Sequence, residues 1–198
     1  MSGNITQCRV RLHAAWAAVN KPFTNVYLIG PMGSGKTTIG QRVAKLLDLE
    51  FLDSDQELEK QTGASVGLIF DLEGEEGFRK RETAMLAKLV TRNGILLATG
   101  GGTVVRRENR EMLKSSGLVV YLSTHVSQQI NRLSHDKSRP LLQSGDREER
   151  LTRLAEVRNP LYEQIADLTF RSQNRGLDSA SRAVYKAILA HQQAIGEK

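Results

Sequence analysis

The sequence of 198 residues contains one cysteine, Cys8, and four scattered histidines, none of them in an H-x-x-x-H pair. A single cysteine excludes both a disulfide scaffold and a cysteine-based zinc site. Aromatic residues make up only 5% of the chain, which argues against a stacking platform for single-stranded nucleic acid. No apolar run approaches the roughly 18 residues of a transmembrane helix. The expected class is a soluble globular protein of one main domain.

Acidic residues are absent from the first 47 positions, and this segment carries the whole net charge of +6. Residues 48–198 hold 22 basic and 22 acidic residues and are neutral as a group. A nucleic-acid or membrane-surface binder is expected to show a basic stripe across its folded domain. We therefore expect neither partner.

Residues 1–22 are expected to form a poorly ordered N-terminal extension, followed by a single domain over residues 23–198. The extension holds the only tryptophan, Trp16, and its apolar stretch Ala14–Val19 is shorter than the core of a signal peptide. Its lack of acidic residues is shared with organellar transit peptides. Its shortness favours a simple extension on a cytoplasmic protein.

Short apolar runs alternate with segments of helical spacing from residue 25 onward. We expect strands at Val26–Ile29, Phe51–Leu52, Ile95–Ala98, Leu118–Leu122 and Asp167–Phe170. We expect helices over 38–47, 56–92 with breaks near Gly63 and Gly74, 108–114, 126–133, 148–165 with an interruption at Pro160, and 179–195. The polar residues 134–146 are expected to form a loop. Continuous apolar strands between helices predict a parallel sheet that is covered on both faces.

The strongest motif is Gly30–Thr37, which matches G-x-x-x-x-G-K-[ST] between an expected strand and an expected helix. Glycines there allow backbone N–H groups to surround phosphate oxygens at a helix N-terminus. Lys36 is expected to reach the β- and γ-phosphates, and the Thr37 hydroxyl to ligate Mg²⁺. The expected nucleotide-binding residues of this loop are Gly33, Ser34, Gly35, Lys36, Thr37 and Thr38.

Two further motifs come directly after expected strands, where ligands bind in open α/β sheets. In Asp53-Ser54-Asp55, carboxylates two residues apart point to the same side of an extended chain, so one can address a metal and the other a substrate hydroxyl. A helix N-cap is the alternative. Gly100-Gly101-Gly102 allows close approach of the backbone to a ligand, or simply forms a tight turn.

Three arginines lie in or beside such motifs: Arg79, Arg139 and Arg158. An arginine is usually a solvated surface charge. The sequence offers no other means of binding an acidic substrate or neutralising a transferring phosphoryl group, and this raises the interest of all three.

Taken in order, six motifs resemble those of the shikimate kinase family: GPMGSGKTTIG, LDSD, FR…E at 78–82, TGGG at 99–102, RPLL at 139–142 and RNPLY at 158–162. The resemblance runs from about Asn25 to about Ala190. It implies ATP-dependent phosphorylation of the 3-hydroxyl of shikimate, a step toward chorismate and the aromatic amino acids. It also implies a P-loop α/β/α fold with a five-stranded parallel sheet in the order 2-3-1-4-5, a mobile lid at about 134–146, and a monomer that uses Mg²⁺.

Carried over residue by residue, the resemblance puts Asp55 on the hydroxyls of shikimate. It puts Arg79 and Arg158 on the carboxylate, with a backbone contact from Gly101. Lys36, Asp55 and Arg139 are the implied catalytic residues.

On the nucleotide side, the resemblance implies that Asp53 holds Mg²⁺ through water, beside Thr37. Arg139 is the implied lid arginine on the phosphates. Arg132 resembles the position that packs on adenine. Arg175 falls where the family makes a further contact on the adenine side.

Other interpretations differ in class. A related small-molecule kinase, such as gluconate kinase, has similar residue chemistry but not this combination of motifs. A nucleoside monophosphate kinase must hold a second phosphate and a base, and the sequence shows no second set of motifs for either. A GTP-driven switch needs N-K-x-D after the nucleotide loop, whereas the only Asn-Lys here is Asn20-Lys21, before it. An inactive homologue acting as a binding module is disfavoured because every expected polar residue is present.

Deleting residues 1–22 should leave kinase activity and thermal stability nearly unchanged, because the first expected strand begins after them. Trp16 lies in the deleted segment, so intrinsic tryptophan fluorescence of the full chain should not respond to shikimate. Steady-state assays, thermal unfolding and a fluorescence titration check this. Strong quenching of Trp16 by shikimate would contradict it.

Overall fold

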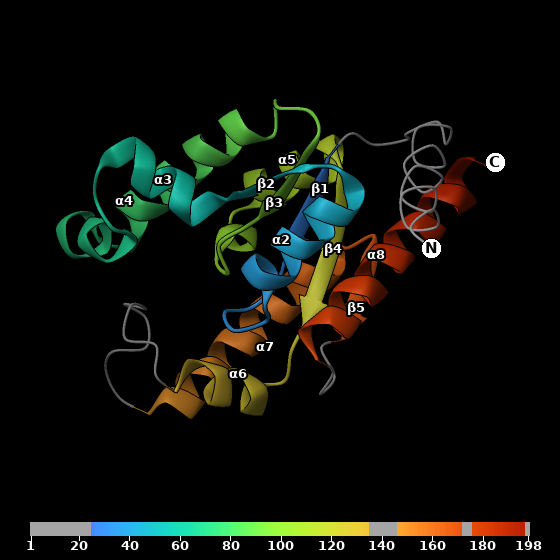
Figure 1. Ribbon diagram of the computed structural model, residues 1–198. Helices are drawn as coiled ribbons and strands as arrows, with labels where there is room; N and C mark the ends of the chain where they lie inside the picture. Colours follow the sequence, from blue (N-terminus) through green and yellow to red (C-terminus); the bar gives the residue numbers. More distant parts are fainter. Residues whose placement is uncertain (1–24, 135–145, 172–175, 197–198) are drawn as a thin grey trace, which may run out of the picture.

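The computed structural model describes residues 25–134, 146–171 and 176–196. Five strands lie there: β1 (Val26–Ile29), β2 (Glu50–Asp53), β3 (Ile95–Ala98), β4 (Leu118–Ser123) and β5 (Leu168–Arg171). All neighbouring strands pair in parallel, in the order β2-β3-β1-β4-β5 (Figure 1). The expected P-loop sheet and its strand order are confirmed.

Helices cover both faces of this sheet. They are α2 (Lys36–Leu47), α3 (Ser54–Thr62), α4 (Val66–Leu89), α5 (Arg107–Ser116), α6 (Val126–Leu133), α7 (Arg147–Ile165) and α8 (Leu177–Gly196), with one 3₁₀ turn, η1 (Thr103–Val105). Helices α2 and α8 pack together on one face, whereas α4, α5 and α7 lie over the other (Figure 1). The described helices contain no segment both long enough and apolar enough to cross a membrane.

Burial on both faces explains the continuous apolar strands. Val26 and Leu28 of β1 belong to the core under α2 and α8, whereas Tyr27 and Ile29 belong to the core under α4, α5 and α7. All four residues are at most 1% exposed. A parallel central strand has no solvent-facing side, so alternation of polar and apolar residues is not needed there.

Helix α2 packs unusually close to the sheet at Gly40. A Cβ atom at this position would lie 2.7 Å from the Phe51 ring and 3.0 Å from the Leu28 side chain. The glycine therefore lets the helix that begins at the nucleotide loop lie directly on β1 and β2. This contact fixes the position of the loop relative to the sheet.

Breaks were expected in two helices, near Gly74 in α4 and at Pro160 in α7. Gly74 has left-handed backbone angles (φ 67°) that kink α4, as expected. The interruption expected at Pro160 was wrong, because α7 runs without a break from Arg147 to Ile165. Buried residues on both sides of the proline, Leu151 and Tyr162 among them, hold the helix against the domain and outweigh the lost hydrogen bond.

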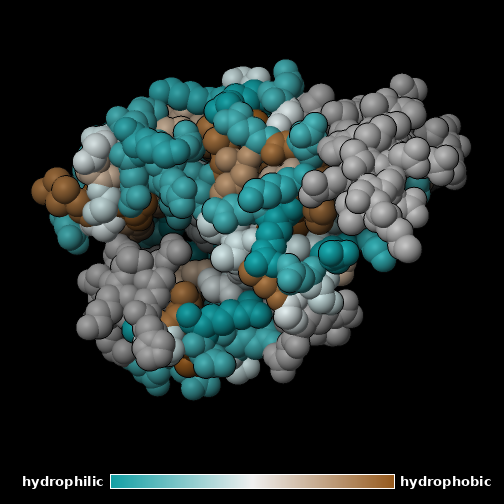
Figure 2. Space-filling view, viewed as in Figure 1, coloured by the Kyte–Doolittle hydropathy of each residue, from teal (hydrophilic) through white to brown (hydrophobic). Residues whose placement is uncertain are grey.

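The surface of the described residues is mainly hydrophilic, as Figure 2 shows from one side. Among the residues that the structure describes, the most exposed large apolar side chain is Leu72, with Leu68 one turn before it on α4. The expected extension at residues 1–22 lies outside the described residues. So does the expected lid, except for its ends at Ser134 and Asp146.

Replacing Gly40 by leucine should lower the free energy of unfolding by about 3 kcal/mol or more, because the new side chain overlaps a packed helix–sheet contact. Urea denaturation measures the change. Gln41→Leu, one residue along the same helix but exposed, is the matched control and should change stability little. Equal stability of the two variants would contradict the close packing.

Candidate active site

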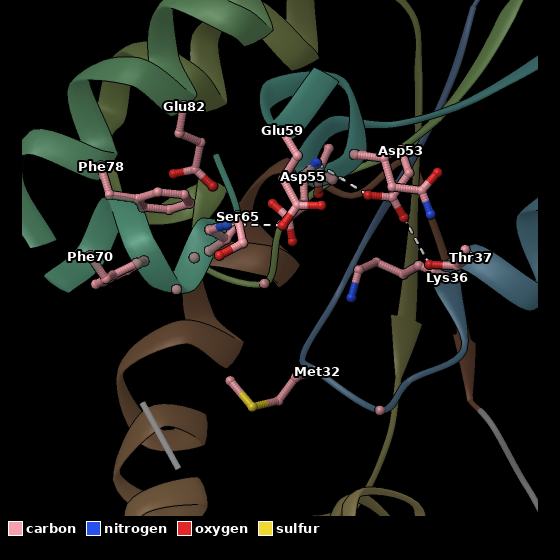
Figure 3. A pocket seen from close by; sticks show the side chains of 18 of the residues that line it. Met32, Lys36, Thr37, Asp53, Asp55, Glu59, Ser65, Phe70, Phe78 and Glu82 are labelled. Carbon is pink, nitrogen blue, oxygen red and sulfur yellow. Dashed lines mark hydrogen bonds between the residues drawn. The ribbon is translucent and has the colours of Figure 1, made fainter. Parts of the chain in front are cut away.

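A cleft of about 880 Å³ lies at the carboxyl edge of the sheet, at the position expected for an open α/β fold. The nucleotide loop and the start of α2 line one side, and α3, α4, α7 and the glycine loop at 100–102 line the rest. Figure 3 shows Asp55 near the middle of the cleft, with Lys36 and Thr37 on one side of it and Phe78 and Glu82 on the other.

The nucleotide loop has the backbone conformation that its glycines predict. Gly33 and Gly35 have φ angles of 75° and 93°, in the left-handed region that glycine adopts most readily. Helix α2 begins at Lys36, so the positive pole of its dipole faces the loop. No acidic residue in its first turn offsets this positive potential. The Lys36 ammonium donates to the carbonyls of Gly30 and Pro31 at 2.8 and 2.9 Å.

Two polar residues, Thr37 and Arg132, tie the loop to other elements, and a third, Ser34, is buried within it. The Ser34 side chain is fully buried, and its hydroxyl has no partner in the described part of the chain. The Thr37 hydroxyl donates to Asp53 Oδ2 at 2.8 Å. Arg132, on α6, donates from Nη1 to the Gly33 carbonyl at 2.9 Å, which places it on the rim of the loop.

Asp53 and Thr37 fit a magnesium site with few protein ligands. A carboxylate and a hydroxyl are hard oxygen donors, and Mg²⁺ usually keeps several waters beside one or two such groups. No cluster of three acidic, histidine or cysteine side chains suited to a metal occurs among the described residues. The pair therefore suits an ion held partly by a nucleotide rather than a closed protein cage.

The geometry expected for Asp53 and Asp55 was wrong in one respect. The two do not share an extended strand, because α3 begins at Ser54. Asp53 is the N-cap of this helix and accepts from the Asp55 backbone N–H at 3.1 Å. Asp53 therefore caps α3 with one carboxylate oxygen while the other accepts from Thr37. Asp55 reaches the cleft from the first turn of α3, where the helix pole favours its negative charge.

The glycines at 100–102 make room for charged side chains. A Cβ at Gly100 would lie 2.8 Å from Glu82 Oε1 and 2.9 Å from Asp55 Oδ1. A Cβ at Gly102 would overlap the Arg79 guanidinium. Close approach of side chains to this backbone, rather than a tight turn alone, accounts for Gly100 and Gly102.

Arg79 is buried and held by carboxylates on its own helix. Its Nη1 donates to Glu82 at 2.8 Å and its Nη2 to Glu75 at 3.1 Å. Glu82 is itself 4% exposed and accepts from the Thr103 hydroxyl at 2.7 Å. Burial alone would lower the pKa of Arg79, but the neighbouring Glu82 and Glu75 carboxylates raise it overall. The guanidinium therefore stays charged in the interior.

Arg158 reaches the same place from α7. It is 6% exposed, and its Nη1 donates to the Gly101 carbonyl at 3.3 Å. Burial lowers the pKa of Arg158, and the positive charge of Arg79 lowers it further. Two buried guanidinium groups thus face the cleft near one another, and an anion placed between them would be stabilised by both.

Apolar side chains complete the cleft. The rings of Phe70 and Phe78 lie 4.5 Å apart between centroids, and both line the cleft together with Met32. The Arg79 guanidinium lies 5.2 Å from the Phe78 ring centroid. This wall suits the carbon skeleton of a small ligand that carries polar groups elsewhere.

The structure thus brings together the nucleotide loop, Asp53, Asp55, Arg79, Gly101 and Arg158. Arg139 and Arg175 lie outside the described residues. The sequence did not single out Glu82, Thr103 or Tyr162 as site residues, although Glu82 and Tyr162 stand within two of the motifs. Their partners lie 21 and 61 residues away along the chain, so local spacing gave no signal for them.

Comparisons with known proteins agree on one family. The family model of shikimate kinase matches residues 32–190. The shikimate kinase of Vibrio cholerae serotype O1 is 49% identical over 167 residues, which cover 84% of this chain and 96% of that protein. The shikimate kinase of Shewanella pealeana is 54% identical over 151 residues, which cover 76% of this chain and 88% of that protein.

Solved structures give the same result. The shikimate kinase from Acinetobacter baumannii in complex with shikimate has a TM-score of 0.81 and 47% identity, covering 90% of this chain and 96% of that one. A gluconokinase from Sinorhizobium meliloti has a TM-score of 0.54 and 17% identity, which shows a shared fold and no more. With five of the six motifs placed around one cleft and these shikimate kinases matched over most of their length, the chain belongs to the shikimate kinase family.

Proposed function

We propose that this protein transfers the γ-phosphoryl group of ATP to the 3-hydroxyl of shikimate, which gives shikimate 3-phosphate and ADP. The observation that carries the proposal is the convergence of the nucleotide loop, Asp55 and the Arg79–Arg158 pair on one cleft. The reaction belongs to chorismate and aromatic amino-acid biosynthesis. We further propose that the protein acts as a monomer in the cytoplasm.

The chemistry of shikimate matches the polar groups of the cleft. The substrate carries one carboxylate and three hydroxyls on a six-membered carbon ring. Arg79 and Arg158 supply donors for the carboxylate, with the Gly101 backbone beside them. Asp55 accepts hydrogen bonds from hydroxyls, and the ring can lie against Phe78.

The groups of the nucleotide loop match the phosphates of ATP in a similar way. Lys36 would exchange the carbonyls of Gly30 and Pro31 for oxygens of the β- and γ-phosphates. The backbone of Gly33, Ser34, Gly35, Thr37 and Thr38 would surround the remaining phosphate oxygens. Arg132 lies beside this loop, where it can contact the base. Arg139 and Arg175 would add contacts to the phosphates and to the adenine side.

Thr37 and Asp53 would hold Mg²⁺, Thr37 through its hydroxyl and Asp53 through a bound water. When bound, the ion supplies positive charge that neutralises the β- and γ-phosphate oxygens. The hydrogen bond between the two side chains keeps both donors together before metal and nucleotide arrive.

Phosphoryl transfer depends mainly on alignment and on neutralisation of charge. Asp55 would orient the 3-hydroxyl toward the γ-phosphate and accept its proton as the new P–O bond forms. Lys36 would stabilise negative charge on the transferring group and on the departing ADP. Arg79 and Arg158 would hold the far end of shikimate and so fix the direction of attack.

A coupled ADP-release assay with shikimate, gluconate and AMP offered in parallel tests the proposed function. We expect turnover with shikimate alone. Gluconate is the most informative competitor because it also has a carboxylate and hydroxyls. Turnover with gluconate or AMP but not with shikimate would overturn the proposal.

Asp55→Asn should reduce kcat by about 10²–10⁴, the usual contribution of a positioned acid–base group, because the amide keeps the shape but loses charge and basicity. The KM for ATP should change little. Asp48→Asn is the control, since Asp48 is exposed at the end of α2 and asparagine tolerates its left-handed backbone. Normal kcat in Asp55→Asn would reduce Asp55 to a residue of the first helical turn.

A further inference from the structure

Tyr162 contacts the glycine loop without reaching the cleft itself. Its side chain is fully buried, and its hydroxyl donates to the Gly101 carbonyl at 2.5 Å. Arg158 donates to the same carbonyl from one turn earlier on α7. Two side chains on one face of a helix therefore share one backbone oxygen of the loop.

The tyrosine ring is itself held firmly. It stacks on Tyr121 of β4, with 5.0 Å between the ring centroids. The Tyr121 hydroxyl donates to Asn159 Oδ1 at 3.2 Å and takes no part in the contact with the loop. Burial strongly raises the pKa of the Tyr162 hydroxyl, so this group keeps its proton and remains a donor near neutral pH.

Fixing the Gly101 carbonyl also fixes the N–H of the next residue. A peptide bond is planar and trans, so the N–H of Gly102 points opposite to the carbonyl of Gly101. Glycine has no side chain to limit rotation, and a loop of three glycines would otherwise sample several peptide orientations. The short contact with Tyr162 restrains the loop, whereas the 3.3 Å contact from Arg158 alone is a weak restraint.

We propose that Tyr162 is a positioning residue for the shikimate carboxylate. By anchoring the Gly101 carbonyl, it sets the orientation of the Gly101–Gly102 peptide and of the Arg158 guanidinium that binds to it. This inference rests on the proposed function, because the site it serves is the proposed carboxylate subsite. Tyr162 is not among the residues that line the cleft, so it would act through the loop and Arg158.

The test is Tyr162→Phe, which keeps the stacked ring and removes only the hydroxyl. We expect the KM for shikimate to rise about tenfold, the effect of losing one hydrogen bond in a buried, charged network. The KM for ATP should stay within about twofold, because the hydroxyl donates to the glycine loop and not to the nucleotide loop.

Two matched variants separate positioning from general packing. Tyr27→Phe removes another buried hydroxyl, bonded to Ser116 far from the cleft, and should lower stability without changing the KM for shikimate. Tyr121→Phe removes the hydroxyl of the stacking partner and should also leave that KM unchanged. Thermal unfolding of all three variants shows whether they are folded at the assay temperature.

A double-mutant cycle with Arg158→Ala locates the effect. Shikimate binding, measured by calorimetry, should fall about tenfold on Tyr162→Phe in the wild-type background and less than threefold in the Arg158→Ala background. An unchanged KM for shikimate in an active Tyr162→Phe enzyme, or equal losses in both backgrounds, would overturn the inference and leave the proposed function standing. Failure of the wild-type protein to bind shikimate would overturn both.

Discussion

Arg79 and Arg158 place two positive charges in the interior of the protein, and much of the site serves to stabilise them there. Removing a guanidinium from water is costly unless its donors find acceptors. Arg79 finds Glu82 and Glu75 on its own helix, whereas Arg158 finds a backbone carbonyl. Gly102 must lack a side chain, because Arg79 occupies the space that a Cβ would need. The glycine loop makes room for the arginine pair, and the arginine pair in turn requires glycine in the loop.

The same edge of the sheet joins this subsite to the nucleotide loop. Asp53 ends β2, caps α3 and accepts from Thr37, so one carboxylate connects the loop to the helix that carries Asp55. Gly100 donates from its backbone N–H to Ser54 at 2.9 Å and thereby ties the glycine loop to the same helix start. The proposed phosphoryl donor and acceptor sites are thus held by one set of strand ends, which fixes their separation.

The sheet could be predicted from the sequence because most of its strands are marked by a short run of consecutive apolar residues. Runs such as Ile95–Ala98 are buried on both faces, and that burial is visible as continuous apolar composition. Local patterns failed where distant packing decides. Pro160 was expected to interrupt a helix that tertiary contacts keep continuous. Asp55 was expected in an extended segment after the strand, whereas α3 already begins at Ser54.

Residue types at the site were predictable, but their supporting contacts were not. The nucleotide loop and the other five motifs each consist of residues close together in the sequence, so their spacing is visible without the structure. The pairs Thr103–Glu82 and Tyr162–Gly101 join segments that are far apart in sequence, and no spacing rule relates them. Arg79 could be named as a candidate from its motif, whereas the fact that it is buried beside Glu82 required the fold.

Charge balance explains why Glu82 accompanies the two arginines. Three charged side chains near the glycine loop are more than nine-tenths buried: Arg79, Arg158 and Glu82. Together they carry one net positive charge, which one substrate carboxylate would neutralise. Glu75, which is exposed, and Asp55 add negative charge at the edge of the subsite, so the excess of positive charge is confined to these three buried groups. The glutamate thus holds Arg79 in place and, under the proposed function, would leave one buried positive charge for the single carboxylate of shikimate.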